Sequence, residues 1–139
     1  MTRGSFKATI GGIEVRRYQT ADGEAPVTVW LDGLRDRSGR ARIVARLDRL
    51  RVGLYGDWKS VGRGFCELRM DFGPGYRVYY AKQNDVMVLL LCGGDKRTQA
   101  KDIETAHGYW KDYQARSGAQ PPVQGVGPSA RRGRNRRLR

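Results

Sequence analysis

Hydrophobic and polar positions recur along the first half of the chain with two different periods. Over residues 13–18 they alternate well enough for a first strand. Pro26 suits the first turn of a helix, and apolar residues then follow at helical spacing up to Leu34. The segment 36–39 breaks this helix, and a second helix over about 40–54 carries a single apolar stripe. The pattern therefore predicts one strand followed by two helices.

Beyond the second helix the period becomes that of β-strands. Apolar and charged residues alternate over 66–72, and a Gly-Pro-Gly turn at 73–75 separates this strand from the next one, over 76–80. Residues 86–92 are apolar on both faces, as in an interior strand, and the two glycines after them are expected to end it. A last helix is predicted over about 98–114. We therefore predict an α+β fold, in which helices pack on one face of an antiparallel sheet and leave the other face open.

Composition divides the chain into a domain over residues 1–118 and a tail over 119–139. The tail combines prolines and glycines with six arginines and no acidic residue, so we expect it to be disordered. The chain has a formal net charge of +13, and subtracting the six tail arginines leaves +7 for the domain. Charge of this size favours polyanionic partners such as nucleic acid.

The sequence predicts no membrane span, no disulfide and no metal site. The apolar run from Val86 to Cys92 is much shorter than the roughly 18 residues of a membrane span. The N-terminus lacks an apolar signal core, so we expect a cytoplasmic protein with no membrane partner. Cys66 and Cys92 stand in apolar runs and are expected to be buried thiols. His107 is the only histidine, and without a Cys/His cluster we expect neither a metal nor a cofactor.

Alternation also gathers polar side chains on the open face of the predicted sheet. Glu67 and Arg69 share that face on one strand, and Arg77 and Tyr79 share it on the next. A three-residue turn would set Arg69 opposite Tyr79. Lys96 arrives from the end of the last strand. These groups suit cleavage of a phosphodiester by the neighbouring 2′-hydroxyl, which needs a proton acceptor, cations around phosphorus and a proton donor.

Each of these candidate catalytic residues has a role in this hypothesis. Arg69 and Arg77 would bind the phosphate, because a guanidinium contacts two oxygens at once. Glu67 would be the base, and Lys96 or Tyr79 would be the proton donor. A solvated sheet face with ordinary cross-strand ion pairs is the alternative, and the pattern by itself favours that alternative.

Other residues are assigned to RNA contact, three of them on one face of the second predicted helix. The residues assigned to RNA binding are Arg42, Arg46, Arg49, Lys59, Tyr79 and Arg97. An ordinary solvated helix face is the alternative for the three helical arginines. We expect Trp30, Trp58 and Trp110 to pack in the core or at its edges rather than to stack on bases.

These segments resemble the RelE/ParE toxin superfamily, in particular its addiction-module killer-protein branch, sometimes called HigB-like. The resemblance covers roughly residues 12–114. The residues that carry it are 64–69 (GFCELR), 73–80 (GPGYRVYY) and 90–96 (LLCGGDK), followed by Thr98-Gln99 and Asp102-Ile103. It implies a RelE-like microbial RNase fold, cleavage of messenger RNA on the ribosome, and neutralisation by an antitoxin, often a small helix-turn-helix DNA-binding protein.

The resemblance also implies roles for individual residues. Arg77 matches the family arginine that binds the scissile phosphate, Arg69 matches a basic position on the preceding strand, and Lys96 falls near a basic or histidine position after the last strand. Glu67 departs from the pattern, because RelE-type enzymes have lysine there, and no histidine or tyrosine closely follows the last strand. The identity of base and acid therefore stays open.

Three functions remain as hypotheses. The first is the toxin of a type II toxin–antitoxin system, a metal-independent endoribonuclease that acts on ribosome-bound messenger RNA. The second is a ParE-like toxin that poisons DNA gyrase and lacks RNase activity. The third is a non-catalytic basic protein that binds nucleic acid. The presence of Arg69, Arg77 and Lys96 favours the first.

Overall fold

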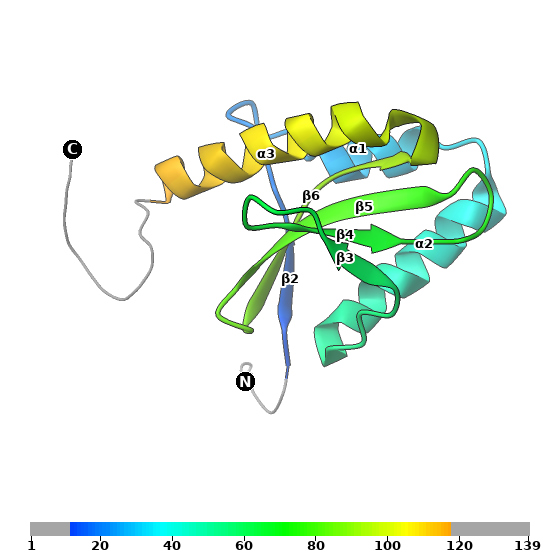
Figure 1. Ribbon diagram of the computed structural model, residues 1–139, viewed down its shortest axis with the longest axis horizontal. Helices are drawn as coiled ribbons and strands as arrows, with labels where there is room; N and C mark the ends of the chain where they lie inside the picture. The colour runs from blue at the N-terminus through cyan, green and yellow to red at the C-terminus, as the bar shows by residue number, and fades with distance from the viewer. Residues whose placement is uncertain (1–11, 118–139) are drawn as a thin grey trace.

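The computed structural model describes residues 12–117, which form an α+β fold built on a mixed sheet, with helices on both of its faces (Figure 1). The elements are β2 (Glu14–Arg17), α1 (Pro26–Gly33), α2 (Arg37–Arg49), η1 (Leu50–Val52), β3 (Trp58–Ser60), β4 (Cys66–Arg69), β5 (Tyr76–Gln83), β6 (Met87–Asp95), η2 (Lys96–Thr98) and α3 (Gln99–Arg116). The strand order in this part of the chain is β2-β6-β5-β4-β3. The predicted α+β class is confirmed, while the predicted tail, residues 119–139, lies outside the described residues.

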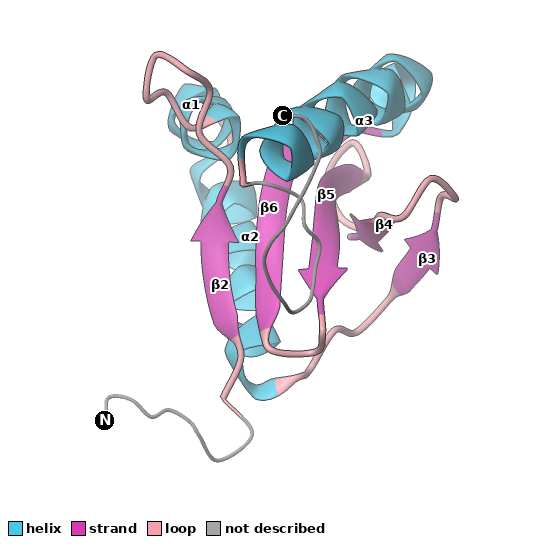
Figure 2. Cartoon of the chain, turned by 90° about the vertical axis from the view of Figure 1, so that its left-hand side faces the viewer, coloured by secondary structure: helices cyan, strands magenta, loops and turns pink. Residues whose placement is uncertain are grey.

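Two details of the predicted arrangement are wrong. The four strands β3 to β6 are antiparallel, but β2 joins the edge of β6 in parallel, with Glu14 opposite Met87. The long path through two helices between β2 and the rest of the sheet allows this direction. The second face is also not open, because α3 packs across it while α1 and α2 cover the first (Figure 2). Ala106 and Trp110 on α3 need a sheet face of their own, since the other face is already filled.

The α1/α2 face of the sheet follows the predicted alternation. Leu68 and Val78 are fully buried there against Ile43 and Leu47 of α2. Burial of each such side chain contributes about 1.5–3 kcal/mol. The helix α2 begins within the segment that was expected to be a break, because the Asp36 side chain accepts a hydrogen bond from the backbone N–H of Gly39 (2.9 Å).

The two consecutive glycines near the end of β6 do not end the strand, which continues to Asp95. A Cβ atom on Gly93 would collide with the ring of Trp30 from α1, and one on Gly94 would collide with the Asp102 carboxylate from α3. Strand glycines often mark such close approaches. Here they let one helix approach on each face, and this brings the start of α3 close to the sheet.

The thiols and tyrosines of the core make the fold sensitive to alkali. Cys66 and Cys92 are free thiols, the first half-buried and the second buried. Burial raises the pKa of Cys92 to about 12, and burial likewise raises the pKa of Tyr79 and of Tyr80 far above their usual range.

No helix in residues 12–117 is long and apolar enough to span a membrane.

Stability is therefore expected to fall as the pH rises above about 9, where these groups ionise in the unfolded chain but stay neutral in the folded one. The loss should continue up to about pH 12, the raised pKa of Cys92. Urea unfolding followed by circular dichroism at one-unit pH steps from 7 to 12 measures this change. A free energy of unfolding that stays constant through pH 11 would contradict it.

Candidate active site

The hairpin of β4 and β5 places the predicted polar residues on one face, in a register shifted by two residues. Arg69 lies opposite Arg77, and Glu67 lies opposite Tyr79. The expected pairing of Arg69 with Tyr79 is therefore wrong, because the connection runs over residues 70–75 and is wider than a three-residue turn. A shift of two residues keeps every side chain on its face, so the predicted grouping survives.

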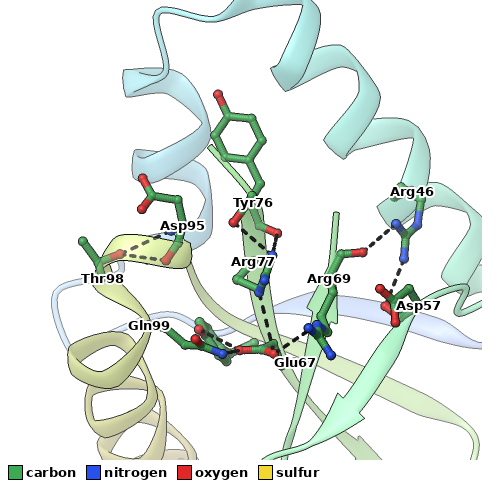
Figure 3. A network of polar contacts seen from close by, with 11 residues as sticks. Arg46, Asp57, Glu67, Arg69, Tyr76, Arg77, Asp95, Thr98 and Gln99 are labelled. Atoms are coloured by element: carbon green, nitrogen blue, oxygen red, sulfur yellow. Dashed lines mark hydrogen bonds and ion pairs between the residues drawn. The ribbon is translucent and has the colours of Figure 1, made fainter. Parts of the chain in front are cut away.

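Glu67 is the centre of this polar group and is completely buried. Its Oε2 atom accepts hydrogen bonds from the Tyr79 hydroxyl (3.2 Å) and from Nε2 of Gln99 (2.6 Å), the first residue of α3. Its Oε1 atom lies 3.7 Å from Nε of Arg69 and 3.7 Å from Nε of Arg77 (Figure 3). The Glu67 carboxylate on β4 thus accepts hydrogen bonds from β5 and from α3, and it lies beside the guanidinium groups of Arg69 and Arg77.

Arg77 is held rigidly in this group. Its side chain is 8% exposed, and its Nη1 atom donates to the backbone oxygens of Gly75 (3.0 Å) and Tyr76 (3.1 Å). Its Nε atom and Glu67 Oε1 are buried without a hydrogen-bond partner in the described residues. Burial of a charge is costly unless the charge is paired and hydrogen-bonded. Arg77 lies near the start of the inner strand β5, and its guanidinium, paired with Glu67 without a hydrogen bond at Nε, is a candidate ligand for an anion.

A cleft of about 330 Å³ opens in front of the two arginines, within the size range of small-ligand sites. Its lining residues are Asp57, Arg69, Met70, Asp71, Gly73, Pro74, Gly75, Arg77 and Lys96. The cleft thus combines three cationic side chains with two carboxylates. Across residues 12–117, no group of three His, Cys, Asp or Glu side chains is arranged to hold a metal ion.

The structure brings together three of the four predicted catalytic residues in this cleft, Arg69, Arg77 and Lys96. The fourth, Glu67, lies behind the arginines without exposed surface, so its expected role as an accessible base is not supported. Tyr79 is likewise fully buried, so its assignment to RNA contact is wrong. The reason is the same for both residues: α3 covers the face that was expected to be open.

Sequence patterns missed two contributors to this site. Gln99 holds Glu67 from α3, and no local periodicity reveals a contact between residues so far apart in the chain. Asp57 lines the cleft just before β3, a strand of three residues that is too short to show alternation. The backbone oxygen of Asp57 accepts a hydrogen bond from the backbone N–H of Arg69 (2.9 Å), which fixes its position beside the arginines.

Arg46 was assigned to RNA binding, but its guanidinium is occupied within the protein. Nη1 donates to the backbone oxygen of Arg69 (3.0 Å), and Nη2 donates to those of Tyr55 (2.9 Å) and Asp57 (3.4 Å). Burial lowers the pKa of Arg46 from its usual value. The assignment is therefore corrected: Arg46 fastens α2 to the wall of the cleft.

The other basic residues assigned to RNA contact remain accessible. Arg42 is exposed and lies 3.9 Å above the centre of the Phe72 ring, beside the loop that lines the cleft. Arg49 and Lys59 are exposed on α2 and β3. Arg97 is exposed as well, although its guanidinium forms an ion pair with Asp95 (3.0 Å). These four side chains stay candidates for contact with phosphates.

Replacing Arg42 or Arg49 with alanine is expected to flatten the dependence of log affinity on log salt by about 0.7 for single-stranded RNA, the effect of one lost phosphate contact. Arg46→Ala should instead lower the free energy of unfolding, because the half-buried hydrogen bonds to the backbone oxygens of Arg69 and Tyr55 are lost. Salt titrations of RNA affinity and urea unfolding separate the two effects. Arg46 would be an RNA ligand if its alanine variant flattened the salt slope while the stability stayed unchanged.

No established protein-family profile matches the chain. Over 77 residues it is 56% identical to an uncharacterized protein of Haemophilus influenzae, and the match covers 55% of this chain and 78% of that protein. The chain belongs to the family of this Haemophilus protein. Membership in this family assigns no reaction to the chain, so the function has to be inferred from the cleft and its charged residues.

Proposed function

We propose that this protein is the toxin of a type II toxin–antitoxin system and that it cleaves ribosome-bound messenger RNA without a metal ion. The observation that carries the proposal is the convergence of Arg69, Arg77 and Lys96 on one cleft. The resemblance of the same segments to RelE/ParE toxins supports it, since three of the matched basic residues line this cleft. We include in the proposal a cognate antitoxin, a small helix-turn-helix DNA-binding protein.

The arginines supply charge stabilisation in the proposed reaction. When the 2′-oxygen attacks phosphorus, negative charge builds on the phosphate oxygens, and fixed cations lower the energy of that transition state. Arg77 is fixed by two backbone oxygens and by Glu67, so little reorganisation is needed at that moment. Glu67 acts here as a positioning residue that orients Arg69 and Arg77 from behind.

The proton transfers are assigned to side chains at the cleft. Asp57 and Asp71 line the cleft, and in the proposed reaction one of these carboxylates accepts the proton of the 2′-hydroxyl. Lys96 is exposed at the start of η2 and donates a proton to the 5′-oxygen as the phosphorus–oxygen bond breaks. The products are a 2′,3′-cyclic phosphate and a free 5′-hydroxyl.

Induction of the full chain in cells, followed by mapping of RNA ends, tests the proposed function. We expect cuts phased with the codons of translated messages, and rescue of growth when the antitoxin is co-expressed. Double-strand breaks in DNA with intact messages would contradict the RNase proposal and support a gyrase poison. Binding of RNA with neither kind of damage would support a non-catalytic nucleic-acid-binding protein.

Cleavage is expected to persist after divalent ions are removed, because Arg69, Arg77 and Lys96 provide the positive charge at phosphorus. The measurement is the cutting rate on ribosome-bound message in EDTA. Polyamines keep the ribosomes intact in this assay, and sedimentation of the ribosomes is the control. A rate that falls to background in EDTA and returns with magnesium would refute the metal-independent mechanism.

A further inference from the structure

Trp58 differs from the other tryptophans in its exposure. It is 51% exposed, whereas Trp110 is 9% exposed and Trp30 packs over Gly93 and against Tyr76. Within residues 12–117, Trp58 belongs to no aromatic pair and to neither core cluster. Apolar area that stays in water contributes nothing to folding. Trp58 is therefore a half-exposed aromatic side chain on the edge strand β3, outside both core clusters.

The indole stands next to the cleft in the chain and in the sheet. Trp58 opens the edge strand β3, and the residue before it, Asp57, lines the cleft and is hydrogen-bonded to the backbone of Arg69. Consecutive Cα atoms lie about 3.8 Å apart, and their side chains point to opposite sides of a strand. Trp58 pairs with Leu68, so its side chain lies on the α2 face of the sheet, opposite the face of Arg69 and Arg77. A single strand of nucleic acid that leaves the cleft therefore has to pass around the edge strand β3 to reach the indole.

Cationic side chains stand at the positions next to Trp58 in the sheet, on the opposite face. Lys59 follows it on β3 and is exposed, and the side chain of Arg69 on the neighbouring strand is 40% exposed. Proteins that bind single-stranded nucleic acid combine cations along the backbone with aromatic rings on which the bases stack. The edge strand β3 offers both within two consecutive residues.

The cleft lacks a surface for a base. None of its nine lining residues is aromatic, so a phosphate held by Arg69 and Arg77 has no stacking partner inside the cleft for the nucleotides that flank it. Among the exposed large hydrophobic residues of the described chain, Trp58 is the one aromatic side chain. Trp58 is therefore the candidate side chain for stacking on a base.

We propose that Trp58 is a stacking platform for a nucleobase of single-stranded RNA whose scissile phosphate lies in the cleft. This inference rests on the proposed function and adds a contact that recognises bases to a cleft that recognises phosphate. Stacking tolerates every base, so Trp58 contributes affinity and register rather than sequence preference.

Fluorescence quenching and binding titrations with the full chain test the platform. The probe is a short oligoribonucleotide with 2′-O-methyl sugars, which cannot be cut, and the matched probe carries abasic sites in place of its bases. Trp58→Ala is expected to weaken binding of the intact probe by about 5- to 100-fold, the effect of one lost stack. Trp58→Phe should restore most of the affinity, and the abasic probe should bind Trp58→Ala and the natural chain equally.

Val86→Ala is the matched control, because Val86 is 60% exposed in the β5–β6 turn, away from the cleft-lining loops. Equal binding of the intact probe by Trp58→Ala and by the natural chain would overturn the platform and leave the indole to a protein partner. An equal loss on both probes would also overturn it. Cleavage of messages is scored separately: a chain that stacks bases on Trp58 but cuts no RNA refutes the proposed function alone.

Discussion

An Arg77→Lys protein is expected to cleave RNA on the order of 10²- to 10³-fold more slowly than the natural chain while it keeps its fold. Lysine preserves a positive charge beside the buried Glu67 carboxylate. It loses the planar fork that binds two phosphate oxygens, and it cannot reproduce the two hydrogen bonds to the oxygens of Gly75 and Tyr76. The loss should therefore appear in the rate of the chemical step.

Single-turnover cleavage rates and thermal unfolding of the same preparations provide the measurement. Arg51→Lys is the matched control, because Arg51 is exposed on η1, outside the cleft lining. The sequence alone suggests Arg77→Ala as the test, on the view that Arg77 lies on an open face. Its burial makes that variant ambiguous, since loss of one partner of a buried ion pair costs about 3–5 kcal/mol. Full activity of a folded Arg77→Lys protein would remove Arg77 from the phosphate site.

Glu67→Gln is expected to lower the free energy of unfolding by about 3–5 kcal/mol, the usual result of breaking a buried ion pair. The amide keeps the shape of the side chain but removes the charge that lies 3.7 Å from both Arg69 and Arg77. The buried Arg77 guanidinium and the 40% exposed Arg69 side chain then lose their shared counter-charge. We expect cleavage to slow as well, because the arginines lose the group that orients them.

Urea unfolding measures the loss of stability, and the pH dependence of the cleavage rate separates this positioning role from a role as base. If Glu67 positions the arginines, the acidic limb of the rate profile persists in Glu67→Gln and disappears when Asp57 and Asp71 are replaced with asparagine. If Glu67 is the base, Glu67→Gln removes the acidic limb, and the loss of stability is the same in both cases because the buried ion pair is broken either way. Glu104→Gln is the control, because Glu104 forms an exposed ion pair with Arg63 (2.9 Å) and such pairs contribute little.

The strands and helices of this protein were largely predictable from periodicity, and the two exceptions have separate causes. The segments over α1, α2, β4, β5 and α3 were recognised, because each buries one face and therefore repeats at its own period. The strand β3 was missed since its three residues are all exposed. The end of β6 was misplaced since Gly93 and Gly94 were taken as a stop, whereas they make room for two helices.

For the candidate site, the grouping of the residues was predictable from the sequence, and their burial was not. Alternation placed Glu67, Arg69, Arg77 and Tyr79 on one face, and this grouping is independent of the register, which was wrong by two residues. The burial of Glu67 and Tyr79 was not predictable, because it depends on α3, whose position relative to the sheet is set by contacts between residues distant in the chain.

The sequence by itself determined the class of the fold, the excess of positive charge and the set of side chains that share a face, because all three depend on composition or on local period. Only the tertiary structure decided which of those side chains meet solvent. The packing of α3 over the sheet turned Glu67 from a candidate base into a buried counter-ion, and the contacts of Arg46 removed it from the RNA-binding surface. The exposure of a side chain depends on how the helices pack on the sheet, and a local stretch of sequence does not specify that packing.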